Sequence, residues 1–299
     1  MASAEHDQFL TTMLQATAEV RAAVLTIEEQ RAGYEAVAAA YLVAEDVAVE
    51  PADAGGVPAE WLSVPGVEDG RTVLYLHGGG YTTGSLSTHR DLASRIGRAA
   101  SARVLSVQYR LAPEHPFPAA LDDAVCAFRW LVANGQDPRR ITVAGDSAGG
   151  GLVATLLLAL RDGGEPAPGA AVMIAPWTDL VPSDATLARR LRRDALIDVD
   201  KWGEAAGHYV GELDPSDPRI SPLHADLSRL CPVLVQVGTA DGLLEDGQGL
   251  VDAIRAAGGE AEIEVFDGCI HVFQQLVPWA PETVQAVDAI GTFVQKHAP

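Results

Sequence analysis

Six short apolar runs separated by helix-forming segments constrain the fold of this chain more than any other feature of its sequence. The runs do not alternate apolar with polar residues, which is typical of strands that are buried on both faces. They cover residues 72–76, 104–109, 141–144, 171–174, 233–237 and 263–266. Helices are expected between most of them, at residues 91–100, 119–133, 152–160 and 243–257. This order predicts an α/β fold with a mostly parallel sheet that carries helices on both faces.

Three parts of the chain depart from this alternation. Residues 1–45 are predicted to be largely helical because their apolar side chains recur at helical spacing, and residues 47–64 read as a β-hairpin. Residues 177–215 carry more helical and proline-containing sequence than a single crossover needs. An insertion there would lie above the strand ends, where α/β sheets bind ligands. We therefore expect a main domain of residues 46–176 and 216–299, covered by a cap that the N-terminal helices and the insertion form.

Composition narrows the classes of partner and location. The chain of 299 residues has 41 acidic and 21 basic side chains, and this formal charge of −20 repels nucleic acid and anionic membranes. Three cysteines without CxxC spacing argue against a zinc site or a disulfide framework. Glu5 and Asp7 stand where a signal peptide would carry basic residues, and no apolar stretch is long enough to span a membrane. We expect a soluble cytoplasmic protein with no nucleic-acid or membrane partner.

Ser147 lies between a predicted strand and a predicted helix, in the sequence Gly145-Asp146-Ser147-Ala148-Gly149. This matches the G-x-S-x-G pattern, in which a nucleophilic serine occupies a sharp strand-to-helix turn. The two outer glycines leave room where neighbouring backbone passes close to the turn. A capping or turn role is the structural alternative. Because a neutral serine is a poor nucleophile until a base takes its proton, the catalytic interpretation requires a base and an acid.

His271 is the histidine best placed to be that base. It follows the run at residues 263–266 and a short loop, so it should lie just beyond the end of a late strand. The other histidines lie near the termini, in predicted helices, in proline-rich or cap segments, or in a glycine loop. They are His6, His77, His89, His115, His208, His224 and His297.

Asp241 is the favoured acid, because it directly follows the strand predicted at residues 233–237, one βα unit before His271. The chain order Ser147, Asp241, His271 is then the nucleophile–acid–base order of α/β-hydrolases. Rival acids exist in the next helix's first turns and in the loop close to the histidine. They are Glu245, Asp246 and Asp267.

A glycine loop, His77-Gly78-Gly79-Gly80-Tyr81, follows the run at residues 72–76. Consecutive glycines let backbone N–H groups approach a ligand closely and adopt positive φ, so they can form an anion-binding nest. Such a nest suits the oxyanion that forms when a serine attacks a carbonyl carbon. A flexible turn is the structural alternative.

Six segments together resemble the bacterial hormone-sensitive-lipase-like carboxylesterases (family IV), a family of α/β-hydrolases. They are HGGGY at 77–81, YRLAPEHPFPAAL at 109–121, GDSAGG at 145–150, ISPLHADL at 220–227, the aspartate of TADGLLED and the histidine of GCIHVF. The segments follow the family's order. The resemblance implies an α/β-hydrolase fold with a central, mostly parallel eight-stranded sheet, helices on both faces and a helical cap.

The resemblance also implies a role for each matched residue. The implied catalytic triad is Ser147, Asp241 and His271. The implied oxyanion hole is formed by the backbone N–H groups of Gly79, Gly80 and Ala148. His77 would brace the glycine loop and take no part in proton transfer.

Two positions depart from the family pattern. The family often has glycine after the catalytic histidine and proline after the acid, whereas this chain has Val272 and Gly242. Both changes affect loop conformation more than chemistry, so they bear on loop geometry and pocket width.

The sequence therefore predicts a serine carboxylesterase that acts on short- to medium-chain esters through an acyl-enzyme intermediate, without a metal or organic cofactor. Its partner would be a small-molecule ester, and the resemblance also allows a homodimer. A lactone or amide hydrolase on the same triad is one alternative, and a non-catalytic ligand-binding protein on this fold is another. The presence of His271 argues against the second. Apolar residues that could line an acyl pocket are Phe9, Met13, Leu14, Trp202 and Tyr209.

Overall fold

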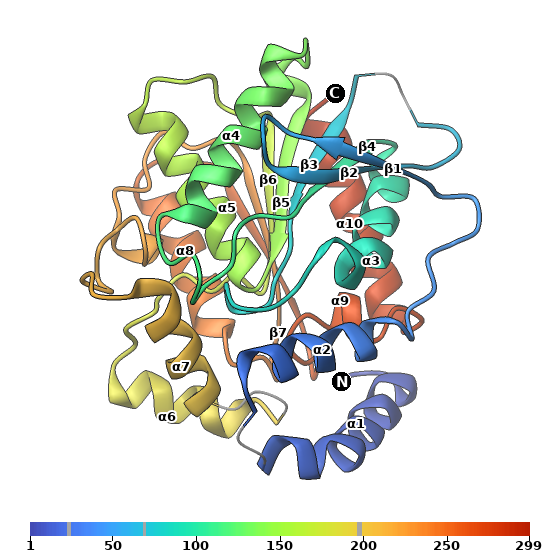
Figure 1. Ribbon diagram of the computed structural model, residues 1–299, viewed down its shortest axis with the longest axis vertical. Coiled ribbons are helices and arrows are strands. Elements are labelled where there is room, and N and C mark those ends of the chain that lie inside the picture. The colour runs from blue at the N-terminus through green and yellow to red at the C-terminus, as the bar shows by residue number, and fades with distance from the viewer. Residues whose placement is uncertain (23–24, 68–69, 196–198) are drawn as a thin grey trace.

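A twisted eight-stranded sheet forms the centre of the protein (Figure 1). The structure is a computed structural model that describes residues 1–22, 25–67, 70–195 and 199–299. The strands are β1 (Ala48–Asp53), β2 (Pro58–Ser63), β3 (Thr72–Leu76), β4 (Arg103–Val107), β5 (Ile141–Asp146), β6 (Ala170–Ile174), β7 (Val233–Gly238) and β8 (Ala261–Phe266). Their order across the sheet is β1-β2-β4-β3-β5-β6-β7-β8. In this order across the sheet, β4, β3, β5, β6, β7 and β8 pair in parallel. The antiparallel hairpin of β1 and β2 is added at one side, where β2 pairs antiparallel with β4.

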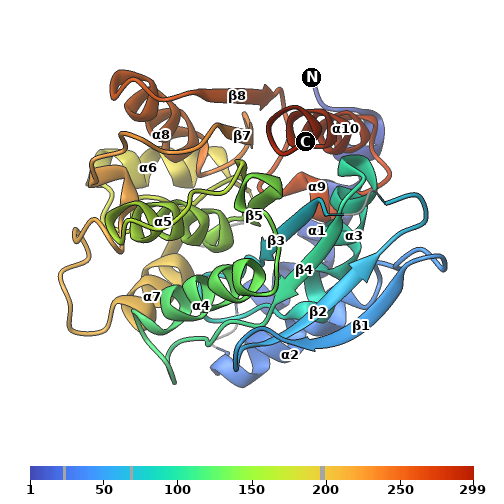
Figure 2. The same ribbon diagram turned by 90° about the horizontal axis from the view of Figure 1, so that it is seen from above.

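Helices cover both faces of the sheet, as Figure 2 shows from above. The layer on one face consists of α4 (Ala119–Ala133), α5 (Ala148–Asp162) and α8 (Leu244–Ala256). The layer on the other face consists of α3 (Leu86–Ala100) and α10 (Pro281–His297). The predicted α/β-hydrolase fold, with a mostly parallel eight-stranded sheet, is confirmed.

Two apolar cores explain why the strands read as uninterrupted apolar runs. Leu74 and Leu76 of β3 pack into the core beneath α4, α5 and α8, whereas Val73 and Tyr75 pack into the core beneath α3 and α10. Because successive side chains of a strand point to opposite faces, a strand with a core on each side needs apolar residues at every position. The sequence pattern thus follows directly from burial on both faces.

Four further helices gather at one end of the sheet, near the bottom of Figure 1. They are α1 (Ala4–Ala22), α2 (Ile27–Ala38), α6 (Asp184–Arg193) and α7 (Val199–Val210). This end is the one where the parallel strands finish, since side chains from α2 and α7 line a cavity with Ser147, which follows β5. The division into a cap of residues 1–45 and 177–215 and a main domain of residues 46–176 and 216–299 stays a prediction.

Helix boundaries differ from those expected from sequence. The helix after β5 begins at Ala148 rather than at residue 152, because three glycines in its first turn give no apolar periodicity. The first helix after the glycine loop begins at Leu86 rather than at residue 91, where the side chain of Ser85 caps the N–H of Thr88. Short elements complete the chain: η1 (Pro138–Arg140), η2 (Pro222–His224) and α9 (Phe273–Leu276). Within the described residues, no helix is long and apolar enough to cross a membrane.

Candidate active site

Ser147 occupies a strained turn between β5 and α5. Its backbone has φ 53° and ψ −120°, a conformation that side-chain-bearing residues rarely adopt and that is typical of functional sites. A Cβ atom on Gly145 would lie 2.6 Å from the carbonyl oxygen of Gly149, and one on Gly149 would collide with the carbonyl oxygen of Leu76. The room that the G-x-S-x-G pattern predicts is therefore needed, because the end of β3 passes directly beside the turn.

His271 connects Ser147 to Asp241 through both nitrogens of its ring. Nε2 lies 3.0 Å from the Oγ of Ser147, and Nδ1 lies 3.0 Å from the Oδ1 of Asp241. Asp241 follows β7 and is fully buried, while His271 lies in the loop between β8 and α9. The same Oδ1 atom also accepts the backbone N–H of Leu243 at 2.8 Å. Three side chains far apart in the sequence thus form one hydrogen-bonded row beyond the ends of β5, β7 and β8.

The electrostatic surroundings strengthen His271 as a base. Burial lowers its pKa, but the charge and hydrogen bond of Asp241 outweigh burial and raise the pKa above its ordinary value. The charges of Asp194 and Asp146 act in the same direction. A base whose pKa lies nearer to the working pH accepts a proton from a hydroxyl more readily.

The rival acids have other partners. Glu245 pairs with Arg189, and Asp246 accepts hydrogen bonds from the buried side chain of Arg190 and from two backbone N–H groups. Asp267 is exposed and accepts the amino group of Met1 and the hydroxyl of Thr239. None of these carboxylates hydrogen bonds to His271 within the part of the chain that the structure describes.

The glycine loop presents backbone donors to the space beside Ser147. Gly79 and Gly80 have φ values of +117° and +63°, and a Cβ atom on Gly79 would collide with the carbonyl of Thr83. Ala148 is the first residue of α5, so its N–H points out of the helix N-terminus. Among the described residues, the N–H groups of Gly79, Gly80 and Ala148 form no hydrogen bond. They are free to donate to an anion in the cavity.

His77 stabilises the glycine loop through its ring and its backbone carbonyl. Its Nδ1 lies 2.8 Å from the carbonyl oxygen of Gly78, its ring stacks on Tyr109 at 4.3 Å, and its carbonyl accepts the Tyr109 hydroxyl at 2.7 Å. Burial, together with the neighbouring His89, lowers the pKa of His77 to about 3. The ring is therefore neutral near pH 7, as a bracing residue requires.

Asp146, the residue before Ser147, was not singled out from the sequence. Its Oδ1 accepts the Tyr75 hydroxyl at 2.7 Å and the backbone N–H of Gly78 at 3.0 Å, and its Oδ2 lies 3.3 Å from Nε2 of His89. Burial raises its pKa, but His89 and the hydrogen bonds from His89 and Tyr75 outweigh burial and lower the pKa. This buried carboxylate ties the glycine loop to the serine turn. Its only signal in the sequence is a charged residue inside an otherwise small-residue motif.

Asp194, at the end of α6, is a second residue that the sequence did not reveal. Its Oδ2 accepts the backbone N–H of Gly242 at 3.0 Å, in the loop that carries Asp241. Proline, which the family often has at this position, has no N–H to donate. The departure at Gly242 therefore provides a direct link between the acid's loop and the segment after β6.

Val272 stands where the family often has glycine, and its backbone conformation is strained. The residue is buried and left-handed, with φ 46° and ψ 43°, a conformation that is unusual for a β-branched side chain. Its side chain packs into the core beneath α3 and α10. Packing thus holds a strained residue directly beside His271.

A cavity of about 250 Å³ opens over Ser147 and His271. The α2 residues Gln30 and Tyr34 line it, as do Trp177 and the α7 residue Trp202. The indole of Trp202 stacks on Trp177 at 5.7 Å and meets the ring of His271 edge-on at 6.1 Å. These contacts place the α7 residue Trp202 directly against the row of Ser147, His271 and Asp241.

Of the five residues expected at an acyl pocket, Trp202 lines this cavity and the other four do not. Tyr209 is buried against Tyr81 at 3.7 Å, and Phe9 packs against Trp279 and the loop before His271. Met13 and Leu14 lie on α1, away from the cavity. Phe9 and Tyr209 thus belong to apolar clusters of the core.

The N-terminal helix also reaches the histidine loop. The ring of His6 is fully buried, and its Nε2 accepts the backbone N–H of Ile270 at 3.2 Å. Helix α1 therefore supports the residue that precedes His271.

Comparison with known proteins agrees with this geometry. Residues 73–275 match the family described as the alpha/beta hydrolase fold. An acetyl-hydrolase of Streptomyces hygroscopicus is 42% identical over 272 residues, which cover 90% of each chain. Carboxylesterase NlhH of Mycobacterium tuberculosis is 36% identical over 225 residues, covering 72% of this chain and 70% of the relative. The crystal structure of an esterase from the bacterial hormone-sensitive lipase family superposes with a TM-score of 0.94 at 42% identity, covering 100% of both chains.

The chain therefore belongs to the α/β-hydrolase family. Within that family it is a member of the bacterial hormone-sensitive-lipase-like (family IV) group, as its resemblance to the group predicts.

Proposed function

We propose that this carboxylic ester hydrolase is a serine esterase in which Ser147 is the nucleophile, His271 the general base and Asp241 the acid that orients it. The observation that carries the proposal is the continuous row from the Ser147 hydroxyl through His271 to Asp241, with both joining distances at 3.0 Å. A nucleophile, a base and an orienting group within hydrogen-bond reach are what covalent catalysis at a carbonyl requires.

Acylation begins when Ser147 Oγ attacks the ester carbonyl carbon and its proton passes to Nε2 of His271. Asp241 stabilises the imidazolium through Nδ1, while the N–H groups of Gly79, Gly80 and Ala148 donate to the oxyanion. The tetrahedral intermediate collapses, the C–O bond to the alcohol breaks, and His271 returns the proton to the leaving oxygen. The products of this stage are the alcohol and an acyl-Ser147 ester.

Deacylation repeats these steps with water as the nucleophile. His271 takes a proton from the water as its oxygen attacks the acyl carbon, and the same N–H groups hold the second oxyanion. The Ser147–acyl bond then breaks, the proton returns to Oγ, and the carboxylic acid leaves. Helix α5 assists both stages because its N-terminus carries a partial positive charge beside the oxyanion.

Substrate size follows from the cavity. A space of about 250 Å³ bounded by the indoles of Trp177 and Trp202 fits a short or medium acyl chain better than a long one. A structural neighbour with a TM-score of 0.91 and 36% identity was crystallised and soaked with p-nitrophenyl butyrate. We therefore propose short- to medium-chain carboxylic esters as the substrate class.

The test compares wild type with Ser147→Ala on p-nitrophenyl butyrate, together with labelling by a fluorophosphonate and intact-mass analysis. Removing the nucleophile should lower kcat by about 10⁴- to 10⁶-fold, and the label should appear on the peptide that contains Ser147 in wild type alone. Ser101→Ala is a matched control at another serine with positive φ, and it should retain full turnover. Substantial hydrolysis by Ser147→Ala, with an unchanged melting temperature, would overturn the assignment.

A further inference from the structure

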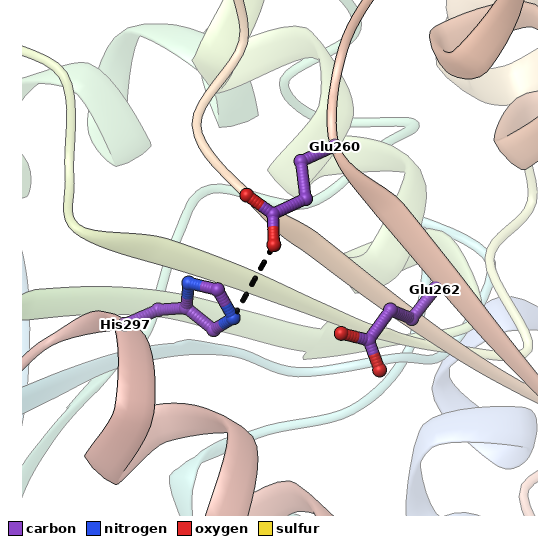
Figure 3. A group of neighbouring side chains, drawn as sticks. All are labelled: Glu260, Glu262 and His297. Atoms are coloured by element: carbon purple, nitrogen blue, oxygen red, sulfur yellow. Dashed lines mark ion pairs between the residues drawn. The ribbon is translucent and has the colours of Figure 1, made fainter.

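Three potential metal ligands lie close together at the end of the sheet opposite the proposed active site. Glu260 and Glu262 lie at the start of β8, and His297 is the last residue of α10. Because the neighbouring strands are parallel, the start of β8 and the turn after β5 lie at opposite ends of the sheet. One ligand atom from each of the three residues lies within 4.8 Å of the others, and Figure 3 shows both carboxylates directed toward the histidine ring.

The ring of His297 is buried without a hydrogen-bond partner for Nε2. The side chain is only 10% exposed, and among the described residues Nε2 accepts or donates no hydrogen bond. The nearest acceptor, Oε1 of Glu260, lies 3.7 Å away, which is too long for a hydrogen bond. Phe293 packs against the ring at 4.5 Å and fixes its orientation. Since buried polar groups are normally satisfied, this nitrogen lacks a ligand.

The two carboxylates bring two negative charges close to the ring of His297. Glu260 and Glu262 are two positions apart on an extended segment, so their side chains leave the strand on the same side. Lys296 pairs with one of them: its Nζ lies 3.5 Å from Oε1 of Glu262, and its side chain is exposed. A flexible surface lysine can swing away when another cation enters.

We propose that Glu260, Glu262 and His297 bind a divalent transition-metal ion, with Zn²⁺ as the best match. One imidazole nitrogen with two carboxylate oxygens is a donor set that suits zinc, whereas Mg²⁺ and Ca²⁺ prefer oxygen ligands alone. Ligands about 2.0–2.2 Å from a tetrahedral zinc ion lie about 3.3–3.6 Å apart, so rotation of the two exposed glutamate side chains would close the site. Water completes the coordination.

The ion would join the end of α10 to the edge strand β8 and play no part in ester hydrolysis. The ligands come together only in the folded chain, so binding stabilises the native state by mass action. At an ion concentration one hundred times Kd, the melting temperature of a protein of this size should rise by about 5 °C.

The experiment uses the full chain after treatment with a chelator and dialysis. Calorimetric titration with ZnCl₂ should give one site per chain, MgCl₂ should give weaker binding, and thermal melts should show the rise with zinc. Glu262→Gln and His297→Asn should each weaken zinc binding at least tenfold. Lys296→Gln should strengthen it, because the competing ammonium is gone.

Controls separate this site from others. His224→Asn removes an exposed histidine that pairs with Asp179 and should bind zinc as wild type does. Hydrolysis of p-nitrophenyl butyrate should be the same with and without one equivalent of zinc, so zinc at His271, which would inhibit, is detected independently. Unchanged zinc affinity in both Glu262→Gln and His297→Asn would overturn the proposal, as would no zinc binding by wild type.

Discussion

Gly242 donates its backbone N–H to the carboxylate of Asp194 at 3.0 Å, and this bond joins the loop of the proposed catalytic acid to the segment that follows α6. The two residues are 48 positions apart. The bond brings a second buried carboxylate near the row formed by Asp241 and His271, where its charge raises the pKa of the histidine.

Replacing Asp194 should therefore change the pH profile. Asp194→Asn keeps an oxygen for the Gly242 N–H but removes the charge, so the pKa of His271 should fall. Because the base works in its neutral form, the acid limb of kcat/KM against pH should move to lower pH. Asp194→Ala should move the limb in the same direction and also lower kcat, since the link to Gly242 is lost.

Glu245→Gln is the matched control for this comparison. Glu245 pairs with Arg189 and, among the described residues, makes no hydrogen bond to His271 or Asp241. The acid limb of Glu245→Gln should therefore coincide with that of wild type. An acid limb that stays in place in Asp194→Asn would show that the charge does not act on His271.

Trp202→Ala should shift the preference toward longer acyl chains. Trp177 and Trp202 line both the cavity over Ser147 and a neighbouring apolar cavity of about 380 Å³, so their indoles stand between the two spaces. Removing one indole joins them, and the ratio of kcat/KM for p-nitrophenyl octanoate to that for the acetate should rise about tenfold or more. Trp279→Ala, which removes a half-exposed indole that meets the ring of Phe9 edge-on, should leave the ratio unchanged. If Trp202→Ala and Trp279→Ala gave the same octanoate-to-acetate ratio, Trp202 would not be the barrier between the two cavities.

Arg190→Met should destabilise the protein far more than Arg189→Met. Arg190 and Asp246 form a buried pair, and losing one partner of such a pair costs about 3–5 kcal/mol. Arg189 and Glu245 form a partly exposed pair, which is worth about 0–1 kcal/mol. Urea denaturation of the three proteins measures the difference, and equal losses would contradict this account of burial.

The Arg190–Asp246 pair also predicts how the loss of stability in Arg190→Met depends on pH. Burial raises the pKa of Asp246 to about 6, although Arg190 opposes this. A carboxyl whose pKa is higher in the folded state than in the unfolded state stabilises the fold at low pH and loses that contribution as pH rises. Without Arg190 the pKa should rise further, so the deficit of Arg190→Met should grow from about pH 4 to pH 8.

The sequence predicts those parts of the molecule whose causes are local. Burial at every position makes β3 and β5 mainly apolar, and the strained turn at Ser147 requires small neighbours, so both leave a pattern along the chain. Asp241 and His271 could be chosen because each lies in the short loop that follows a strand. Their assignment as catalytic residues stays a prediction that the proposed experiments test.

Contacts that depend on the path of the chain between elements could not be predicted. Asp194 has no recognisable motif, and its bond to Gly242 exists only because α6 ends above the loop after β7. Phe9 and Tyr209 have the composition of pocket residues, but packing between helices buries them elsewhere. Nothing in the spacing of apolar residues distinguishes these two outcomes.

The bond from Ile270 to the ring of His6 has a consequence for synthesis of the protein. His6 leaves the ribosome 264 residues before Ile270, and the neighbouring His271 follows only after β8 has been made. The nascent chain contains Ser147 before it contains His271, the proposed base. Helix α1 can therefore contact the loop at Ile270 only after that loop has been made. Ester cleavage should therefore begin only after the segment that carries His271 has been made and has folded, which limits premature reaction in partly made chains.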